Sequence, residues 1–220
     1  MLAVEPLTWE TDAPIRNSTG LGVLLFSTEP ARWISRAYTD LAVYAGPEPD
    51  ADRQKDAKQL RGTVVEQIEA AMGYLQVSPY VPVAAIKDDW GRQDRPAYSL
   101  RALQEGIVNA LVHRDYTVRG SPVRLFLFPD RIEISSPGRL PNTLTPADLF
   151  AGCQPIRRNQ MLAGFLRDYT SPLTQRSYME ARGEGFLAMV RECQKVSGRR
   201  PALDVIGDSV RLTIFAAAPV

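Results

Sequence analysis

Hydrophobic positions recur with a clear period after residue 98 and less regularly before it. Leu103, Ile107 and Leu111 repeat at helical spacing behind Ser99, a residue type that caps helices, so a helix is predicted there. Turn and cap residues delimit the other predicted elements. These are strands at 123–128 and 131–135, a short helix after Thr145, helices at 159–169 and 185–196, and closing strands at 203–206 and 210–215.

The first part of the chain has one strong helix signal. Thr63 and Glu66 form a capping-box pattern, and the apolar spacing continues from it as an amphipathic helix. The other predictions are strands at 21–26, 36–44 and 80–86, a loop or linker at 46–57, and a charged loop at 87–96. We therefore expect an α/β fold of the α+β sandwich type over residues 99–220. A smaller α/β segment over residues 1–86 precedes it, with the boundary at 87–98.

Composition excludes several classes of function. The 220 residues are 45% hydrophobic and 23% charged, which is ordinary for a globular protein. A net charge of +1 encodes no overall attraction to nucleic acid or membranes. His113 is the only histidine, which excludes a His-based zinc site or a Ser-His-Asp triad elsewhere. Cys153 and Cys193 lack metal-ligand spacing, and no apolar run reaches membrane length, so we expect a cytoplasmic protein with reduced thiols and no membrane partner.

The pair Glu105 and Asn109 is the leading site candidate. The two residues are four apart on the predicted helix, so their side chains lie on one side. Val108 and Val112 flank them, which indicates that this side is covered. A covered carboxylate requires a metal, a hydrogen bond or a shifted pKa. The pair is therefore either a functional site or an ordinary polar helix face.

The end of that helix has two interpretations. His113 and Arg114 could place a cation at the helix C-terminus, where it interacts favourably with the helix dipole. Either residue could instead approach a phosphate group.

Two further groups also have two interpretations each. Gly183 and Gly185 open a helix, where free N–H groups favour phosphate binding, but glycine-rich helix starts are common. Arg157 and Arg158 could clamp a phosphate or lie solvated at a helix N-terminus.

Four motifs follow one another in the second part. They are Glu105-Gly-Ile-Val-Asn109-Ala-Leu-Val-His113-Arg114-Asp115-Tyr116, Glu133-Ile-Ser-Ser136-Pro137-Gly138-Arg139-Leu-Pro141, Gly152-Cys-Gln-Pro-Ile-Arg157-Arg158-Asn159-Gln-Met-Leu162-Ala163 and Glu180-Ala-Arg-Gly183-Glu184-Gly185-Phe186. In this order they resemble the ATP-binding (HATPase) module of bacterial regulators that carry a Schlafen/AlbA-type DNA-binding domain. Those regulators are labelled as related to RecG-type helicases. The resemblance extends upstream to about Gly20.

The module in that family is a variant of the GHKL fold shared by gyrase, Hsp90-type chaperones, histidine kinases and MutL. The resemblance therefore implies a GHKL/Bergerat-like mixed sheet with helices on one face. It also implies ATP and Mg²⁺ as ligands, with Asn109 holding Mg²⁺ and Glu105 orienting or deprotonating the attacking water as the catalytic residue. The nucleotide contacts that it implies are Asn109, His113, Arg114, Ser135, Gly138, Arg158, Gly183 and Gly185.

Two departures from the family pattern bear on activity. Arg139 replaces a glycine in a loop that should approach the base, and Glu184 stands where threonine is usual. A carboxylate about 4 Å from a phosphate oxygen is repelled by roughly 1 kcal/mol in water and about 4 kcal/mol at an effective dielectric of 20. We therefore expect ATP binding with slow or absent hydrolysis.

The resemblance implies a nucleotide-binding regulatory module of a DNA-linked transcriptional regulator. The alternatives are a degenerate GHKL scaffold for dimerisation, including a homodimer, or protein interaction, and a DNA-binding regulator with an Arg-rich face. No G-x-x-x-x-G-K-[ST] motif occurs, so the sequence carries no P-loop motor. The family's DNA-binding domain and winged helix are missing, so we expect a fragment or shortened relative that contacts DNA only through domains absent from this chain.

Overall fold

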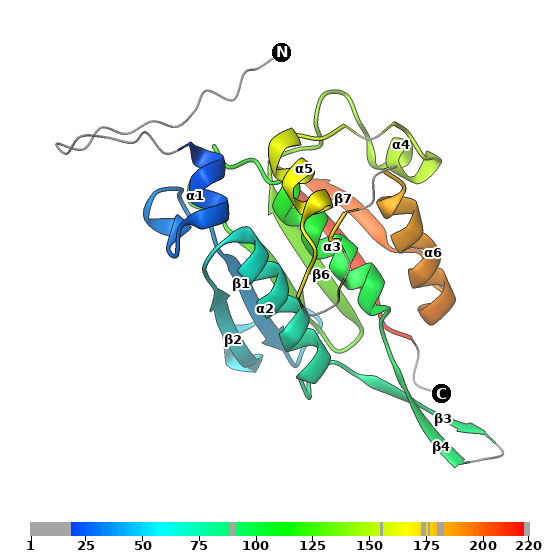
Figure 1. Cartoon of the computed structure of the whole chain (residues 1–220). Helices are drawn as coiled ribbons and strands as arrows, with labels where there is room; N and C mark the ends of the chain where they lie inside the picture. The colour runs from blue at the N-terminus through cyan, green and yellow to red at the C-terminus, as the bar shows by residue number, and fades with distance from the viewer. Residues whose placement is uncertain are drawn as a thin grey trace.

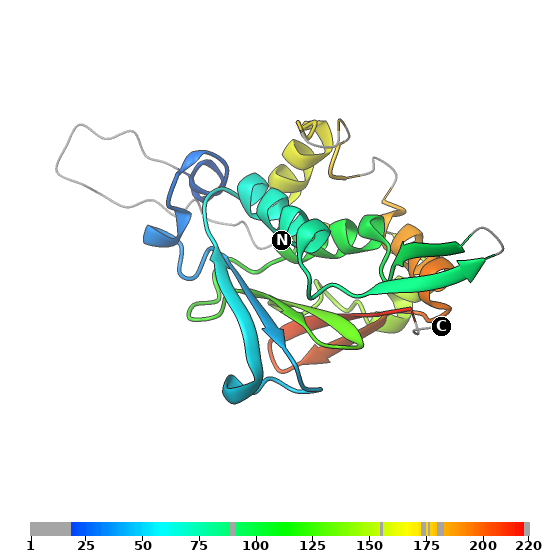
Figure 2. The ribbon, with the colours of Figure 1, turned by 90° about the horizontal axis from the view of Figure 1, so that it is seen from below.

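A six-stranded mixed sheet organises the molecule (Figure 1). The computed structural model describes residues 19–88, 91–154, 156–172, 175, 177–179 and 183–217. The strands of the sheet, in spatial order, are β2 (Gln54–Leu60), β1 (Thr39–Tyr44), β5 (Val123–Leu127), β6 (Arg131–Pro137), β8 (Ser209–Phe215) and β7 (Ala202–Ile206). Helices cover one face of this sheet, which confirms the predicted α+β sandwich (Figure 2).

The two faces of the sheet carry different sets of side chains. β1 and β5 are parallel, and every other neighbouring pair is antiparallel. Because side chains alternate along a strand, one set faces the helices and the next set faces away. Leu41, Leu125, Ile134 and Leu212 are buried on the helical face. The central strands therefore supply the apolar floor on which the helices pack.

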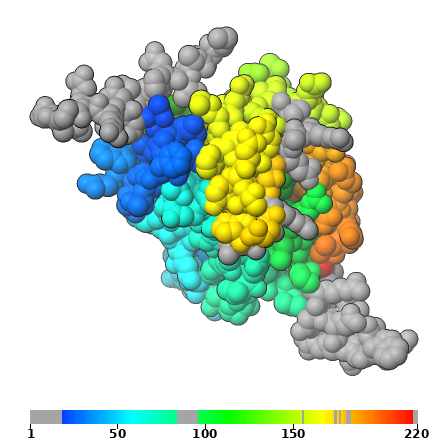
Figure 3. Space-filling model, in the orientation of Figure 1, coloured from blue at the N-terminus to red at the C-terminus, as the bar shows by residue number. Residues whose placement is uncertain are grey.

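The helices form a layer over that floor. They are α1 (Gly20–Phe26), α2 (Val64–Val77), α3 (Leu100–Val112), α4 (Pro146–Ala151), α5 (Gln160–Asp168) and α6 (Gly185–Ser197), with short 3-10 turns at Pro30–Arg32 and Ala51–Arg53. α3 lies at the centre and contacts α2, α6 and β6. On the outer surface, α5 lies between α1 and α6 (Figure 3).

Polar caps fix where these helices begin. Thr63 accepts from the Glu66 N–H at 3.2 Å, and the Glu66 carboxylate accepts from the Thr63 N–H at 2.7 Å. This reciprocal pair confirms the predicted capping box and satisfies two amide groups that the helix leaves without partners. Ser99 caps α3 as predicted, accepting from the Ala102 N–H at 3.3 Å.

Three local predictions were wrong. Residues 21–26 form helix α1 rather than a strand, because Thr19 caps the segment by accepting from the Gly22 N–H. The predicted loop at 46–57 contains the start of β2, whose exposed polar residues are typical of an edge strand. The predicted charged loop at 87–96 contains strand β4.

A two-stranded hairpin extends from the body of the molecule. It consists of β3 (Val83–Asp88) and β4 (Gly91–Pro96), which pair with each other and not with the main sheet (Figure 1). The boundary proposed at 87–98 falls on this hairpin, while strands from both sides of it share one sheet. Within the described residues, no helix is both long and apolar enough to cross a membrane.

Candidate functional site

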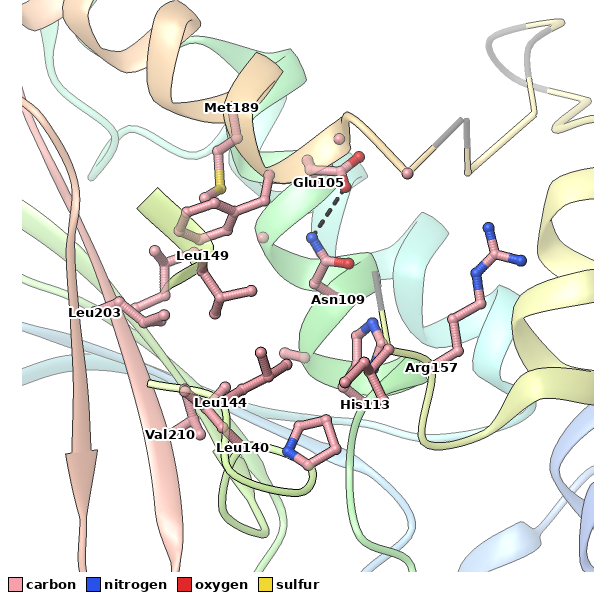
Figure 4. Close-up of a pocket in the computed structure, with 18 of the residues that line it drawn as sticks. Glu105, Asn109, His113, Leu140, Leu144, Leu149, Arg157, Met189, Leu203 and Val210 are labelled. Atoms are coloured by element: carbon pink, nitrogen blue, oxygen red, sulfur yellow. Dashed lines mark hydrogen bonds between the residues drawn. The ribbon is translucent and has the colours of Figure 1, made fainter. Parts of the chain in front are cut away.

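A cavity of about 600 Å³ opens beside α3. Its walls come from α3, the segment after β6, α4, the start of α6 and the β7–β8 hairpin. Apolar side chains gather on one side, Glu105, Asn109 and His113 lie along α3, and Arg157 stands on the other side (Figure 4). The cavity therefore has an apolar half and a polar half.

The apolar half is built from strands, helices and a loop that are distant in sequence. Its side chains are Ile134, Leu144, Leu149, Phe186, Met189, Leu203, Val210 and Leu212. Three of these come from β7 and β8, where strand alternation points Leu203, Val210 and Leu212 toward the helical face. A wall of this kind suits the face of a flat aromatic ring system.

Glu105 and Asn109 are joined by a hydrogen bond in the polar half. The Asn109 Nδ2 donates to Glu105 Oε1 at 2.9 Å (Figure 4). A carboxylate only accepts, so this bond fixes the orientation of the carboxamide. The Asn109 Oδ1, which is the atom that can bind a cation, is left outside this bond. Both side chains are half-buried.

Glycines allow the chain to approach these side chains closely. A Cβ at Gly185 would overlap the Glu105 carboxylate, so a larger residue where α6 begins requires that side chain to move. Gly138 has a φ of +104°, and a Cβ there would overlap the Arg158 guanidinium. Both glycines line the cavity, as does Gly183.

His113 is neutral at physiological pH. Burial, together with the positive charges of Arg158 and Arg157, lowers its pKa from 6.5 to about 4. His113 lines the cavity and follows the last residue of α3. It therefore provides a neutral donor and acceptor at the cavity wall and does not act as a cation at the helix C-terminus.

The arginines of the motifs have different positions. Arg157 lines the cavity. Arg158 donates through Nη2 to the Arg139 carbonyl and lies 3.8 Å from the Asp115 carboxylate, so it fixes the segment after β6. Arg114 is wholly buried and donates to the Arg36, Ser35 and Ser121 carbonyls. Neither Arg114 nor Arg158 is among the residues that line the cavity.

The two serines of the second motif face opposite sides of the sheet. Ser136 lines the cavity and donates to the Ala110 carbonyl at 2.6 Å. Ser135 lines a smaller cavity on the other face. Alignment on the motif selected Ser135, whereas strand alternation with the buried Ile134 selects Ser136.

The two departures from the family pattern both line the cavity. Arg139 is bound at its rim through Nε to the Asp208 carboxylate at 3.0 Å. Glu184 immediately precedes α6, is exposed, and has no ion pair with a described residue. Residues 180–182 of the fourth motif lie outside the described residues.

Sequence reasoning missed some residues that shape the site. Asn159 donates through Nδ2 to the Val112 and Arg114 carbonyls at 2.7 and 2.9 Å, which closes the C-terminus of α3. Its place beside Arg158 in the third motif was a signal for such a role. The described residues contain no group of three or more His, Cys, Asp or Glu side chains placed to hold a metal.

Similarity to known proteins agrees with an ATPase-like domain. Residues 120–214 match the family model described as "Putative ATP-dependent DNA helicase recG C-terminal". This stretch resembles an ATPase domain. The match spans β5 to β8 and begins after α3, so Glu105 and Asn109 lie outside it. No curated protein matches the sequence.

A solved structure shares the fold. The crystal structure of the DIP2311 protein from Corynebacterium diphtheriae superposes with a TM-score of 0.74 at 19% sequence identity. The superposition covers 93% of this chain and 38% of that one. The chain thus corresponds to well under half of the length of that protein, and at this identity the likeness concerns the fold alone.

Proposed function

We propose that this chain is a nucleotide-binding regulatory module that holds ATP with Mg²⁺ in the cavity beside α3. The cavity, with its apolar half beside the hydrogen-bonded Glu105 and Asn109, carries the proposal. Its volume of about 600 Å³ is within the range for a ligand of nucleotide size. The RecG-type family match over residues 120–214 supports an ATPase-like domain independently.

The residues present fit a magnesium nucleotide. Magnesium keeps several water ligands and needs only one or two protein oxygens, so the Asn109 Oδ1 together with phosphate oxygens is a sufficient site. When bound, Mg²⁺ would neutralise part of the phosphate charge. Arg157 and the first N–H groups of α6 are available to phosphate oxygens on the polar side of the cavity.

Each side chain then has a definite role. Glu105 can accept a proton from water within about 3 Å, the reach required of a general base. His113 donates or accepts one hydrogen bond as a neutral imidazole. Glu184 places a negative charge beside the phosphate side and has no ion pair with a described residue, which opposes tight binding and turnover. We therefore propose binding with slow or absent hydrolysis.

Titration with Mg-ATP tests the proposal directly. Ligand at 100 times its dissociation constant should stabilise the fold by about 2.7 kcal/mol, visible as a rise in melting temperature. Asn109→Ala should remove the dependence of binding on Mg²⁺, while Glu105→Gln should retain binding and abolish any turnover. If millimolar Mg-ATP produces no shift in melting, the scaffold alternative, in which the module serves dimerisation or protein interaction, replaces this proposal.

Replacing Glu184 distinguishes a cavity that binds nucleotide from one that does not. Glu184→Thr removes the carboxylate and should tighten ATP binding about tenfold, equivalent to about 1.4 kcal/mol. ADP should gain less because it lacks the γ-phosphate. A scaffold without a nucleotide site would show no gain for either nucleotide, and calorimetry on the wild type and this variant distinguishes the two cases.

The link to DNA is also a proposal. It rests on the resemblance to DNA-linked regulators, while the net charge of this chain is +1. We expect weak binding to duplex DNA with a shallow salt dependence, because few phosphates would be neutralised. Sub-micromolar binding at physiological salt in a mobility-shift assay would instead favour a DNA-binding regulator.

A further inference from the structure

A second cavity, of about 300 Å³, lies on the face of the sheet opposite α3. Residues of β5, β6 and β8 form its floor, and Arg124, Ser135 and Arg211 are among its lining residues. Ser136, the next residue after Ser135, faces the larger cavity, so the sheet itself separates the two.

Strand register brings the two arginines together. Arg124 pairs with Ser135, and Ser135 pairs with Arg211, so the three residues form one row across three strands. Paired residues point to the same face, and neighbouring strands lie about 4.8 Å apart, which separates the two arginine Cα atoms by roughly 10 Å. Two guanidinium groups therefore flank a gap one strand wide, with a serine at its base.

Two arginines and one carboxylate line this cavity. Glu133 also lines the cavity, but Arg131 binds it at 2.7 Å and Arg211 lies 3.6 Å from it. Arg124 has no hydrogen bond or ion pair to the described residues. Glu133 is thus shared between Arg131 and Arg211, while Arg131 also binds Asp130 at 3.0 Å.

Two further carboxylates stand beside the row. Asp40 and Asp204 pair in register with Arg124 and Arg211. Neither carboxylate lines the cavity, and among the described ion pairs neither is joined to its neighbouring arginine. The row as a whole is therefore close to neutral, and the donors left for a ligand are the Arg124 guanidinium and the Arg211 Nε.

One donor in this row is left unused. The Arg211 Nε is buried and has no hydrogen-bond partner among the described residues. Buried donors are normally paired, and each exception calls for an explanation such as an anion. This unpaired donor is an observation separate from the cavity and the strand register, and it also supports an anion site.

We propose that this second cavity binds a phosphate group through Arg124 and Arg211, with the hydroxyls of Ser135 and Ser209 as additional donors. One guanidinium can satisfy a carboxylate through two parallel hydrogen bonds. Two guanidinium groups on opposite sides of a serine suit an anion with three or more oxygens and a higher charge. The phosphate can be free or carried by a small phosphomonoester.

Binding of inorganic phosphate to the full chain tests this assignment. Calorimetry and thermal melting would compare phosphate, acetate and glycerol 3-phosphate against chloride at equal ionic strength. Arg124→Gln and Arg211→Gln should each weaken phosphate binding at least tenfold, and the exposed Arg191→Gln on α6 should leave it unchanged. Tighter binding of the phosphomonoester than of phosphate would identify a small molecule as the source of the group.

A separate variant tests whether phosphate binds at the proposed nucleotide site instead. Arg157→Gln alters the larger cavity, so it should leave this phosphate binding intact even if nucleotide binding fails. Loss of phosphate binding in Arg157→Gln but not in Arg124→Gln would overturn the assignment. So would equal effects of acetate and phosphate, or no effect of phosphate beyond that of chloride. Arg124 is exposed and has no partner among the described residues, so its variant tests the site without disturbing the fold.

Discussion

Replacing Arg114 by methionine should destabilise the protein without changing its cavity. The guanidinium is wholly buried, and it donates to the Arg36 carbonyl at 2.7 Å, the Ser35 carbonyl at 2.9 Å and the Ser121 carbonyl at 3.1 Å. It also lies 4.9 Å from the centre of the Tyr116 ring. Methionine has a similar length and no donors, so these three carbonyls would lose their partner.

The cost can be estimated from these contacts. A hydrogen bond to a charged group contributes about 1.5–3 kcal/mol, and the burial that lowers the pKa of Arg114 offsets part of that gain. Leaving three carbonyls without this donor costs about 1–3 kcal/mol each, and the relief of burying a charge offsets part of this, so we expect a net loss of about 3–5 kcal/mol. For a chain of this size, about 2–4 °C is lost per kcal/mol, so the melting temperature should fall by roughly 6–20 °C.

Thermal unfolding together with calorimetry of Mg-ATP separates structure from binding. We expect Arg114→Met to lower the melting temperature while the affinity per folded molecule stays unchanged. Arg157→Met is the matched control, because Arg157 lines the cavity and should show the opposite pattern. Unchanged melting with lost affinity in Arg114→Met would refute this reasoning and give Arg114 the phosphate contact expected from the motif.

Three further predictions follow from caps, protonation and close packing. Thr63→Ala should cost about 1 kcal/mol, measured by urea unfolding, because it removes the capping box of α2; an unchanged midpoint would show that the cap contributes nothing. The folded pKa of His113, about 4, lies below its unfolded value of about 6.5, so stability should fall as pH drops from about 6.5 to 4, by roughly 2–3 kcal/mol. That fall should be smaller in His113→Gln, and NMR titration of this single histidine should show a higher pKa when Mg-ATP is bound. Gly185→Ala should displace the Glu105 carboxylate and weaken nucleotide binding at least tenfold in calorimetry, while an unaffected affinity would place the nucleotide elsewhere.

Strong local signals predicted much of the fold. The cap at Ser99 with its apolar stripe, the Thr63 capping box and the strand pairs predicted at 123–135 and 203–215 all correspond to elements of the structure. Weak signals failed where tertiary context decides. Residues 21–26 are a short apolar run, for which periodicity cannot distinguish strand from helix, and the Thr19 cap decides for helix. Strand β2 is polar because it lies at the edge of the sheet, so its sequence pattern predicted a loop.

The candidate site was predictable only in part. Glu105 and Asn109 are neighbours through helical spacing alone, and the structure joins them by a hydrogen bond. The apolar wall could not be found in this way, because Leu203 and Leu149 meet only through the sheet order and the position of α4. For Arg114 the motif predicted a phosphate contact. It gives no indication that the side chain points away from the cavity and donates to the backbone carbonyls of residues 35, 36 and 121.

The parallel pairing of β1 with β5 constrains how the chain folds during synthesis. Thr39 pairs with Val123, and everything between them, including α2, the β3–β4 hairpin and α3, must be made before this pair can close. Contacts between residues so distant in sequence slow folding, because loop closure precedes any stabilising contact. Until β5 leaves the ribosome, β1 and β2 form at most an isolated antiparallel pair with an open edge. Strands β1 and β2 therefore depend on the second half of the chain, and a pause in translation before residue 123 would leave an aggregation-prone edge exposed.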